Sequence, residues 1–313
     1  MYKIVNSPIA SWRGDFWRGI HYNIEMNWQL PLFLSIVFAT LRGFLDKKLV
    51  DRSDPFFVLL VTEGWISIFF FTVYFLINRS LPPILPEMII LGGLFMFIVG
   101  FYLEAIKISL SKTIILSSYY LLITMILSFI FLGEWRIFYI NSLNGWKNIG
   151  GAILALLSMY FLLKSHTKKE EKMERKFLFF ISLNILLNGI GTFWGKSYLQ
   201  THGELDVILS QTVGALFVII PINLFKRNSF NKDANFHFLA LLDGIVIFLV
   251  IWTFTIALKR GPAVLVLPIQ TVLTTIFIAL IGLFVFNEVK SITYEKKIGL
   301  VLGLVGVLAL IIN

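Results

Sequence analysis

The sequence contains no cysteine, and this absence excludes a disulfide framework, a thiolate metal site and a cysteine nucleophile. Histidine is almost as scarce. The four histidines, His21, His166, His202 and His237, lie in tails, in connections or at a predicted helix start, and no two have the spacing of metal ligands. The phosphate-binding loop Gly-x-x-x-x-Gly-Lys-Ser/Thr is also absent, which excludes ATP driving within this chain. We therefore expect no metal and no cofactor.

Charged residues are few, at 14% of the 313 residues, whereas 58% are hydrophobic. Soluble domains average about 25% charged and about 45–50% apolar residues. The mean hydropathy of +0.84 and the 31 phenylalanines exceed what one soluble core of this length buries. The composition excludes a soluble domain. The net charge of +9 does not indicate nucleic acid, because the basic residues lie in short connections between apolar runs, where membrane proteins carry topology signals.

Ten apolar runs are each long enough to cross a hydrocarbon layer of roughly 30 Å as a helix. They span residues 30–49, 55–77, 88–108, 113–133, 147–164, 177–199, 206–225, 236–258, 264–286 and 295–312. Backbone that faces lipid must satisfy its own hydrogen bonds, so runs of this length predict helices. We predict an all-α membrane protein with about ten transmembrane helices in contact with membrane lipids.

The polar segments divide this chain into four parts. Residues 1–28 have no continuous apolar stretch and so do not form a cleavable signal peptide; they are either an interfacial segment or sequence upstream of a start at Met26. The hydrophilic stretch 165–176 then separates a first five-helix unit, residues 29–164, from a second, residues 177–313.

The two five-helix units carry the same markers in the same order. The fourth run ends at Gly133-Glu134 and the ninth at Asn287-Glu288, and each is followed about a dozen residues later by a similar helix start, at 147–150 and 296–299. The chain is therefore a duplication. An odd number of helices per unit places the two copies in opposite orientations, which is typical of secondary transporters with a substrate site between the repeats.

These features resemble the drug/metabolite transporter superfamily. The segment from Ala257 to Pro268, running on to Asn287-Glu288, is similar to the EamA-type pattern, and the nearest branch is that of multidrug-resistance efflux transporters. The resemblance covers roughly residues 28–313. It is looser in the first half, where Ser109-Leu-Ser111 replaces Gly-Pro-Ala and no proline corresponds to Pro268. It implies two five-helix halves and export of a small molecule.

Three charged residues lie deep inside predicted helices. At 1.5 Å per residue, Arg42 lies about 18 Å along the first run, and Glu63 about 12 Å into the second, which travels back. Asp243, about 10 Å into the eighth run, lies near the same level. Arg42 and Glu63 are expected to form an ion pair, either as a structural lock or as part of a substrate or proton site. Asp243 lies either near a water-filled vestibule or in the central pocket.

Other charged residues lie near the ends of runs. Lys47 and Lys196 correspond between the repeats, and we expect both to extend to the lipid headgroups. Glu134 and Glu288 end their helices, and we expect them to orient or cap the connection that follows.

Polar and aromatic residues provide further candidates for the cavity wall. Asn184 and Asn188 share one helix face, which points inward either for packing or to bind substrate. The resemblance implies that the third, fourth, eighth and ninth helices line a cavity, and Tyr120 and Gln270 are expected to reach it. Trp65 and Trp252 lie well inside their runs and either pack or surround a ligand.

Small residues mark the fifth and tenth runs. Gly299 and Gly303, with Gly151 in the corresponding run, predict close helix packing, and dimerisation is the alternative. The chain is thus expected to be a monomer or a homodimer.

The basic residues give an orientation that differs from that of the family. Odd-numbered connections hold 17 Lys and Arg, against 8 in the amino-terminal tail and the even-numbered connections. The positive-inside rule then places both termini outside, whereas the resemblance implies termini inside. Ten helices place both termini on the same side in either case.

The sequence as a whole favours a secondary transporter over an enzyme. We expect a multi-pass exporter of a small metabolite or amphiphilic drug in the cytoplasmic membrane, working by alternating access and coupled to protons through Glu63. The alternatives are a membrane-embedded enzyme that acts on a lipid-linked substrate and a scaffold that transports nothing. A cavity between the halves that contains Glu63, Asn188 or Gln270 would distinguish the transporter from a scaffold with a sealed core.

Overall fold

The computed structural model describes residues 28–108, 113, 116–139, 142–167, 175–226, 233–285 and 294–311. They form ten α-helices and one short 3-10 helix, and no strand occurs among them. The first half contains α2 (Gln29–Val50), α3 (Pro55–Asn78), α4 (Pro86–Ile108), α6 (Tyr120–Phe131), η1 (Glu134–Phe138) and α7 (Leu143–Thr167). The second half contains α8 (Arg175–Leu199), α9 (Glu204–Lys226), α10 (Ala234–Arg260), α11 (Ala263–Val285) and α12 (Tyr294–Ile311).

The predicted all-α fold is confirmed, because each of the ten apolar runs coincides with a helix. Six helices within the described ranges are long and apolar enough to cross a membrane. The fourth run differs most from its prediction: α6 has only 12 residues because Ser118 and Tyr119 form a turn before Tyr120. The tail before Trp28, most of the linker 165–176, Ser109-Leu-Ser111 and Asn287-Glu288 lie outside the described residues.

Helices α3 and α10 start where the sequence supplies a cap. The Asp54 carboxylate accepts a hydrogen bond from the backbone N–H of Phe56 (2.9 Å), and Pro55 occupies the first turn, where a missing N–H costs nothing. The Asp233 carboxylate accepts from the N–H of Asn235 (3.0 Å) in the same way. Such polar breakers set the boundaries between consecutive helices.

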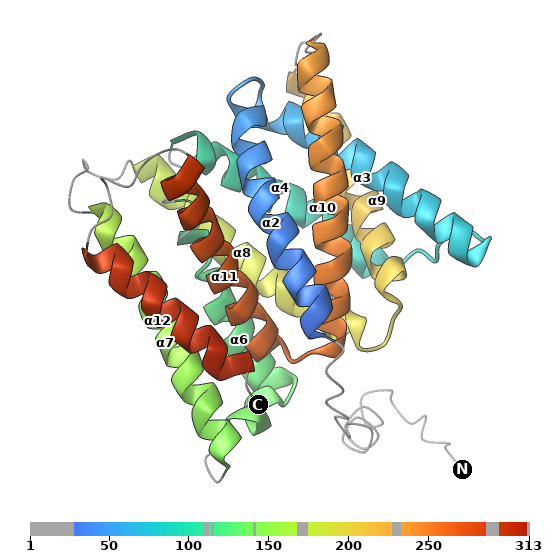
Figure 1. Cartoon of the computed structure of the whole chain (residues 1–313). Helices are drawn as coiled ribbons and strands as arrows, with labels where there is room; N and C mark the ends of the chain where they lie inside the picture. The colour runs from blue at the N-terminus through green and yellow to red at the C-terminus, as the bar shows by residue number, and fades with distance from the viewer. Residues whose placement is uncertain are drawn as a thin grey trace, which may run out of the picture.

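The two halves pack through equivalent helix pairs. Helix α2 contacts α10 and α11, just as α8, its counterpart, contacts α4 and α6. Three pairs join counterparts directly: α3 with α9, α6 with α11, and α7 with α12. Helices α7 and α12 lie side by side at one edge of the bundle, and α2 and α10 run together near its middle (Figure 1). This correspondence is what the sequence duplication predicts.

Contacts at the ends of α10 show that the halves are inverted. Arg52, just after α2, pairs with Asp233 at the start of α10 (Nη1 to Oδ2, 3.6 Å). Lys196, near the end of α8, binds the carbonyl of Gly261 just after α10 (2.8 Å). Because α10 is a helix of 27 residues and about 40 Å, α2 and α8 end on opposite faces of the bundle. We call the face at Arg52 face 1 and the face at Lys196 face 2.

Small residues bring α7 and α12 into close contact across the two halves. A Cβ atom placed on Gly151 would lie 2.8 Å from the backbone oxygen of Gly306, and one on Gly299 would lie 3.0 Å from that of Ser158. The Ser158 hydroxyl donates to the Gly299 carbonyl (2.6 Å), and Gly303 packs against the same hydroxyl. The structure thus brings Gly151, Gly299 and Gly303 together within one chain.

Candidate functional site

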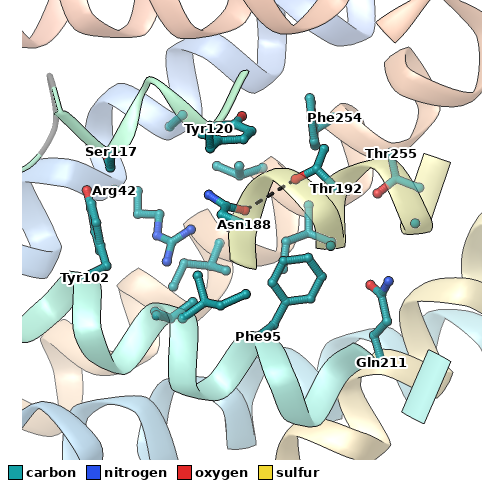
Figure 2. A pocket seen from close by; sticks show the side chains of 18 of the residues that line it. Arg42, Phe95, Tyr102, Ser117, Tyr120, Asn188, Thr192, Gln211, Phe254 and Thr255 are labelled. Carbon is teal, nitrogen blue, oxygen red and sulfur yellow. Dashed lines mark hydrogen bonds between the residues drawn. The ribbon is translucent and has the colours of Figure 1, made fainter. Parts of the chain in front are cut away.

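A cavity of about 430 Å³ lies between the two halves. Its walls come from α2, α3, α4 and α6 of the first half and from α8, α9, α10 and α11 of the second. Side chains of both halves converge on it, among them Arg42, Phe95, Asn188 and Phe254 (Figure 2). A cavity of this size matches the usual range for small-molecule sites.

Six of the nine residues proposed from the sequence line this cavity. They are Arg42, Glu63, Tyr120, Asn184, Asn188 and Gln270. Asp243 is fully buried next to the cavity but is not part of its wall.

The two tryptophans lie outside the wall as well. Trp65 stacks on Phe69 (ring centroids 6.1 Å apart) and lies against Gly244 of α10. Trp252 packs on Phe248 (5.4 Å). Trp65 thus packs against α10, and Trp252 packs against a cluster of residues from α3, α9 and α10, and neither lines this cavity.

Arg42 is paired with Asp46, and not with Glu63 as the sequence analysis expected. The Nε atom of Arg42 lies 3.3 Å from Oδ2 of Asp46, one turn further along α2. Residues four apart are neighbours on a helix, so Asp46 reaches the guanidinium without any contribution from α3. Sequence reasoning missed Asp46, although its spacing from Arg42 was the available signal.

Glu63 and Asp243 remain close to this pair without joining it. Glu63 lines the cavity with 8% of its surface exposed, and within the described ranges it has no hydrogen bond or ion pair to its carboxylate. Asp243 is 0% exposed, and both of its carboxylate oxygens lack a hydrogen-bond partner among the described residues. Both carboxylates interact electrostatically with Arg42. Three carboxylates therefore surround one guanidinium.

The three charges lie at one level, as predicted. Arg42, Glu63 and Asp243 are each about 12–14 Å from the helix end at face 1, counted at 1.5 Å per residue. This depth is close to the middle of a hydrocarbon layer of roughly 30 Å. The polar centre of the protein is therefore in the half of the bundle nearer face 1.

Two amides of the wall also hold helices together. The Asn184 amide donates from Nδ2 to the carbonyl of Ile98 on α4 (3.0 Å), and Gln270 donates from Nε2 to the Ser35 hydroxyl on α2 (3.0 Å). Both bonds cross between the two halves. Asn184 and Gln270 thus combine a packing role with a place at the cavity.

At face 2, Glu134 caps a helix of the opposite half. Its two carboxylate oxygens accept hydrogen bonds from the backbone N–H groups of Ala263 and Val264, at 3.0 Å each, where α11 begins. An anion at a helix N-terminus is stabilised by these free donors and by the helix dipole. Burial raises the pKa of the Glu134 carboxyl above its ordinary value, while the Lys196 charge and the two N–H donors act in the opposite direction. Glu134 therefore caps α11 instead of the connection that follows it.

Lys196 belongs to the same arrangement. The prediction that it extends to the lipid headgroups is wrong. It is 3% exposed, and its ammonium group donates to the backbone carbonyls of Leu258 and Gly261 at the end of α10. It also interacts electrostatically with Glu134. We call Glu134, Lys196 and the connection between α10 and α11 (residues 261–262) the face 2 latch. The last carbonyl groups of α10 have no partner within their helix and accept from Lys196 instead. The position of Lys196 in its run does not predict this contact, because it depends on where α10 ends in space.

Comparison with known proteins finds a family match for the second half. Residues 175–312, which include the segment Ala257–Pro268, match the model of the EamA-like transporter family. The carboxyl-terminal half of this chain is therefore similar to an EamA-like transporter domain. A solved crystal structure, one of 26 matching chains, superposes with a TM-score of 0.70 over 91% of this chain and 96% of its own. At 13% identity this likeness shows a shared fold. A comparison with curated proteins finds no match.

Proposed function

We propose that this protein is a secondary transporter that exports a small metabolite or amphiphilic drug across the cytoplasmic membrane, with both termini on one side. The EamA-like domain belongs to a family of membrane transporters. The observation that carries the proposal is the cavity between two inverted halves, lined by residues of both halves and containing Arg42 and Glu63. Inverted repeats that rock about a central site give alternating access.

The corresponding lysines of the two repeats occupy different environments, which supports the same mechanism. Lys196 is buried in the face 2 latch. Its counterpart Lys47 has a side chain that is 34% exposed and pairs with Asp51 on its own helix turn (2.8 Å). In a carrier that is closed at only one face, corresponding residues of the two repeats are expected to be buried at the closed face and exposed at the open one.

The cavity favours this proposal over a scaffold, which would have a sealed core. Glu63, Asn188 and Gln270 all line the cavity, and any one of them there was expected to distinguish a transporter from a scaffold. An enzyme acting on a lipid-linked substrate has no comparable support.

Replacing Glu63 with glutamine is expected to reduce transport at least tenfold and to remove its dependence on a pH gradient, because the amide keeps the shape of the side chain but cannot exchange a proton. Proteoliposomes containing a pH-sensitive dye measure this, with solutes chosen by a thermal-shift screen of cationic drugs and amino acids. The control is Glu204→Gln, which removes a carboxylate from an ion pair with Lys259 (3.2 Å) away from the cavity. Full transport by Glu63→Gln that still depends on pH would refute a coupling role for Glu63.

A further inference from the structure

The charges at the cavity do not balance. Among the described residues that line it, only Arg42, Asp46 and Glu63 are charged. Arg42 and Asp46 form a pair at 3.3 Å and cancel each other. Glu63 remains, and Asp243 adds a second carboxylate behind the wall, where it interacts with Arg42 and Asp46. The cavity region therefore carries a formal excess of two negative charges.

This imbalance favours a positively charged ligand. A buried charge is costly unless it is paired, and Glu63 is more than nine-tenths buried at the cavity with no hydrogen bond or ion pair in the described part of the chain. A ligand with an ammonium group supplies the missing partner. A carboxylate ligand meets the opposite situation, because the one guanidinium at the cavity already interacts with three carboxylates, those of Asp46, Glu63 and Asp243.

The amides of the wall leave acceptors rather than donors. The NH₂ groups of Asn184 and Gln270 donate to protein oxygens, and within the described part of the chain the Oδ1 and Oε1 atoms of the same side chains are buried without a hydrogen-bond partner. Asn188 is the exception, since its Oδ1 accepts from the Thr192 hydroxyl (3.3 Å). The two buried oxygens of Asn184 and Gln270 lie in residues of the wall, and together with the Glu63 carboxylate they favour a ligand that carries N–H donors over one that carries acceptors alone.

Aromatic rings complete the wall. Phe95, Tyr102, Tyr120 and Phe254 line the cavity, and Figure 2 shows their rings around it together with Arg42 and Asn188. Aromatic faces attract cations and pack against apolar groups. The wall thus suits a ligand with a charged end and an apolar body.

We propose that the cavity binds an organic ammonium ion, whose N–H groups pair with the Glu63 carboxylate and whose apolar body packs against Phe95 and Phe254. This inference rests on the proposed transport function and specifies the chemical class of its substrate. A neutral or anionic solute of the same shape leaves Glu63 unpaired.

A ligand series with one apolar body and different head groups tests the proposal. The purified full-length protein in detergent is titrated with 2-phenylethylammonium, 2-phenylethanol and 3-phenylpropionate, and with the corresponding series on a cyclohexyl body, by calorimetry. The trimethylammonium analogue of each amine tests the need for N–H donors. We expect each primary amine to bind at least tenfold more tightly than its alcohol, its carboxylate and its trimethylated form. Glu63→Gln is expected to remove this preference, whereas Glu204→Gln is expected to retain it.

The proposal is overturned if the carboxylate or the alcohol binds as tightly as the amine, if no amine binds, or if Glu63→Gln keeps the full preference. Equal binding by the trimethylated amines overturns the role of N–H donors. Flux into proteoliposomes separates this proposal from the proposed function. Amines that bind but are not moved support the ligand class and contradict transport, and movement of the carboxylates alone supports transport and contradicts the ligand class.

Discussion

Replacing Glu134 with alanine is expected to lower the free energy of unfolding by about 3–5 kcal/mol, because the change removes one member of a buried charge pair. Both capping hydrogen bonds to the N–H groups of Ala263 and Val264 are lost, and Lys196 keeps its carbonyl acceptors but loses the opposite charge. The eight tryptophans allow unfolding in detergent to be followed by intrinsic fluorescence. The expected fall in Tm is roughly 6–12 °C.

A second glutamate near the same face provides the control. Glu204 also pairs with a lysine, Lys259, but both side chains are partly exposed, so Glu204→Ala is expected to cost less than about 1 kcal/mol. Replacing both charges of the latch, by Glu134→Ala together with Lys196→Met, is expected to recover part of the loss because no buried charge is left without its partner. If Glu134→Ala is no more harmful than Glu204→Ala, the latch does not hold face 2 together.

Replacing Gly92 with alanine is expected to separate α4 from α9 and to lower the free energy of unfolding by about 3 kcal/mol or more. A Cβ atom at this position would lie 1.8 Å from the backbone oxygen of Gln211. A backbone atom cannot move aside as a side chain does, so the two helices must shift. A Cβ atom placed on Gly214 would likewise lie 1.9 Å from the backbone oxygen of Ile89. The Tm in detergent measures the effect.

Gly64 is the matched control, because it lies inside helix α3 and a Cβ atom there meets nothing within 4 Å. Gly64→Ala is expected to raise stability by up to about 1 kcal/mol, since alanine loses less backbone freedom than glycine in a helix. A Gly92→Ala protein as stable as the Gly64→Ala protein would mean that α4 and α9 are not packed backbone to backbone.

The helices could be predicted from the sequence because each depends on a local property. Run length and breakers such as Asp54-Pro55 fixed the start of α3, and the duplication predicted the inverted pairing of the halves. The start of α6 within the fourth run is set by the turn at Ser118 and Tyr119, which hydropathy does not reveal.

The site was predicted less completely, because its contacts depend on which helices pack against each other in the folded protein. The common level of Arg42 and Glu63 followed from helix rise alone, but the partner of Arg42 was Asp46 on the same helix. The position of Lys196 near the end of its helix is typical of an interfacial residue. Its burial follows from the packing of α8 against the end of α10, where its ammonium group binds the Gly261 carbonyl. The rotation of α3 about its axis, which turns Trp65 away from the cavity, is set by packing against α10.

The proposed transport cycle requires that the cavity between the inverted halves is accessible to water and opens to the two sides of the membrane in turn. The absence of native cysteine allows a single cysteine to be introduced without background, and Thr192→Cys places it in the cavity wall. A membrane-impermeant maleimide is applied to right-side-out and inside-out vesicles, with Ser67→Cys, a buried position of α3 outside the cavity wall, as the control. We predict that Thr192→Cys is labelled from one side at rest and from the other under a reversed solute gradient, whereas Ser67→Cys stays unlabelled. Labelling of Thr192→Cys from one side only under every gradient, or from neither side, would contradict the account.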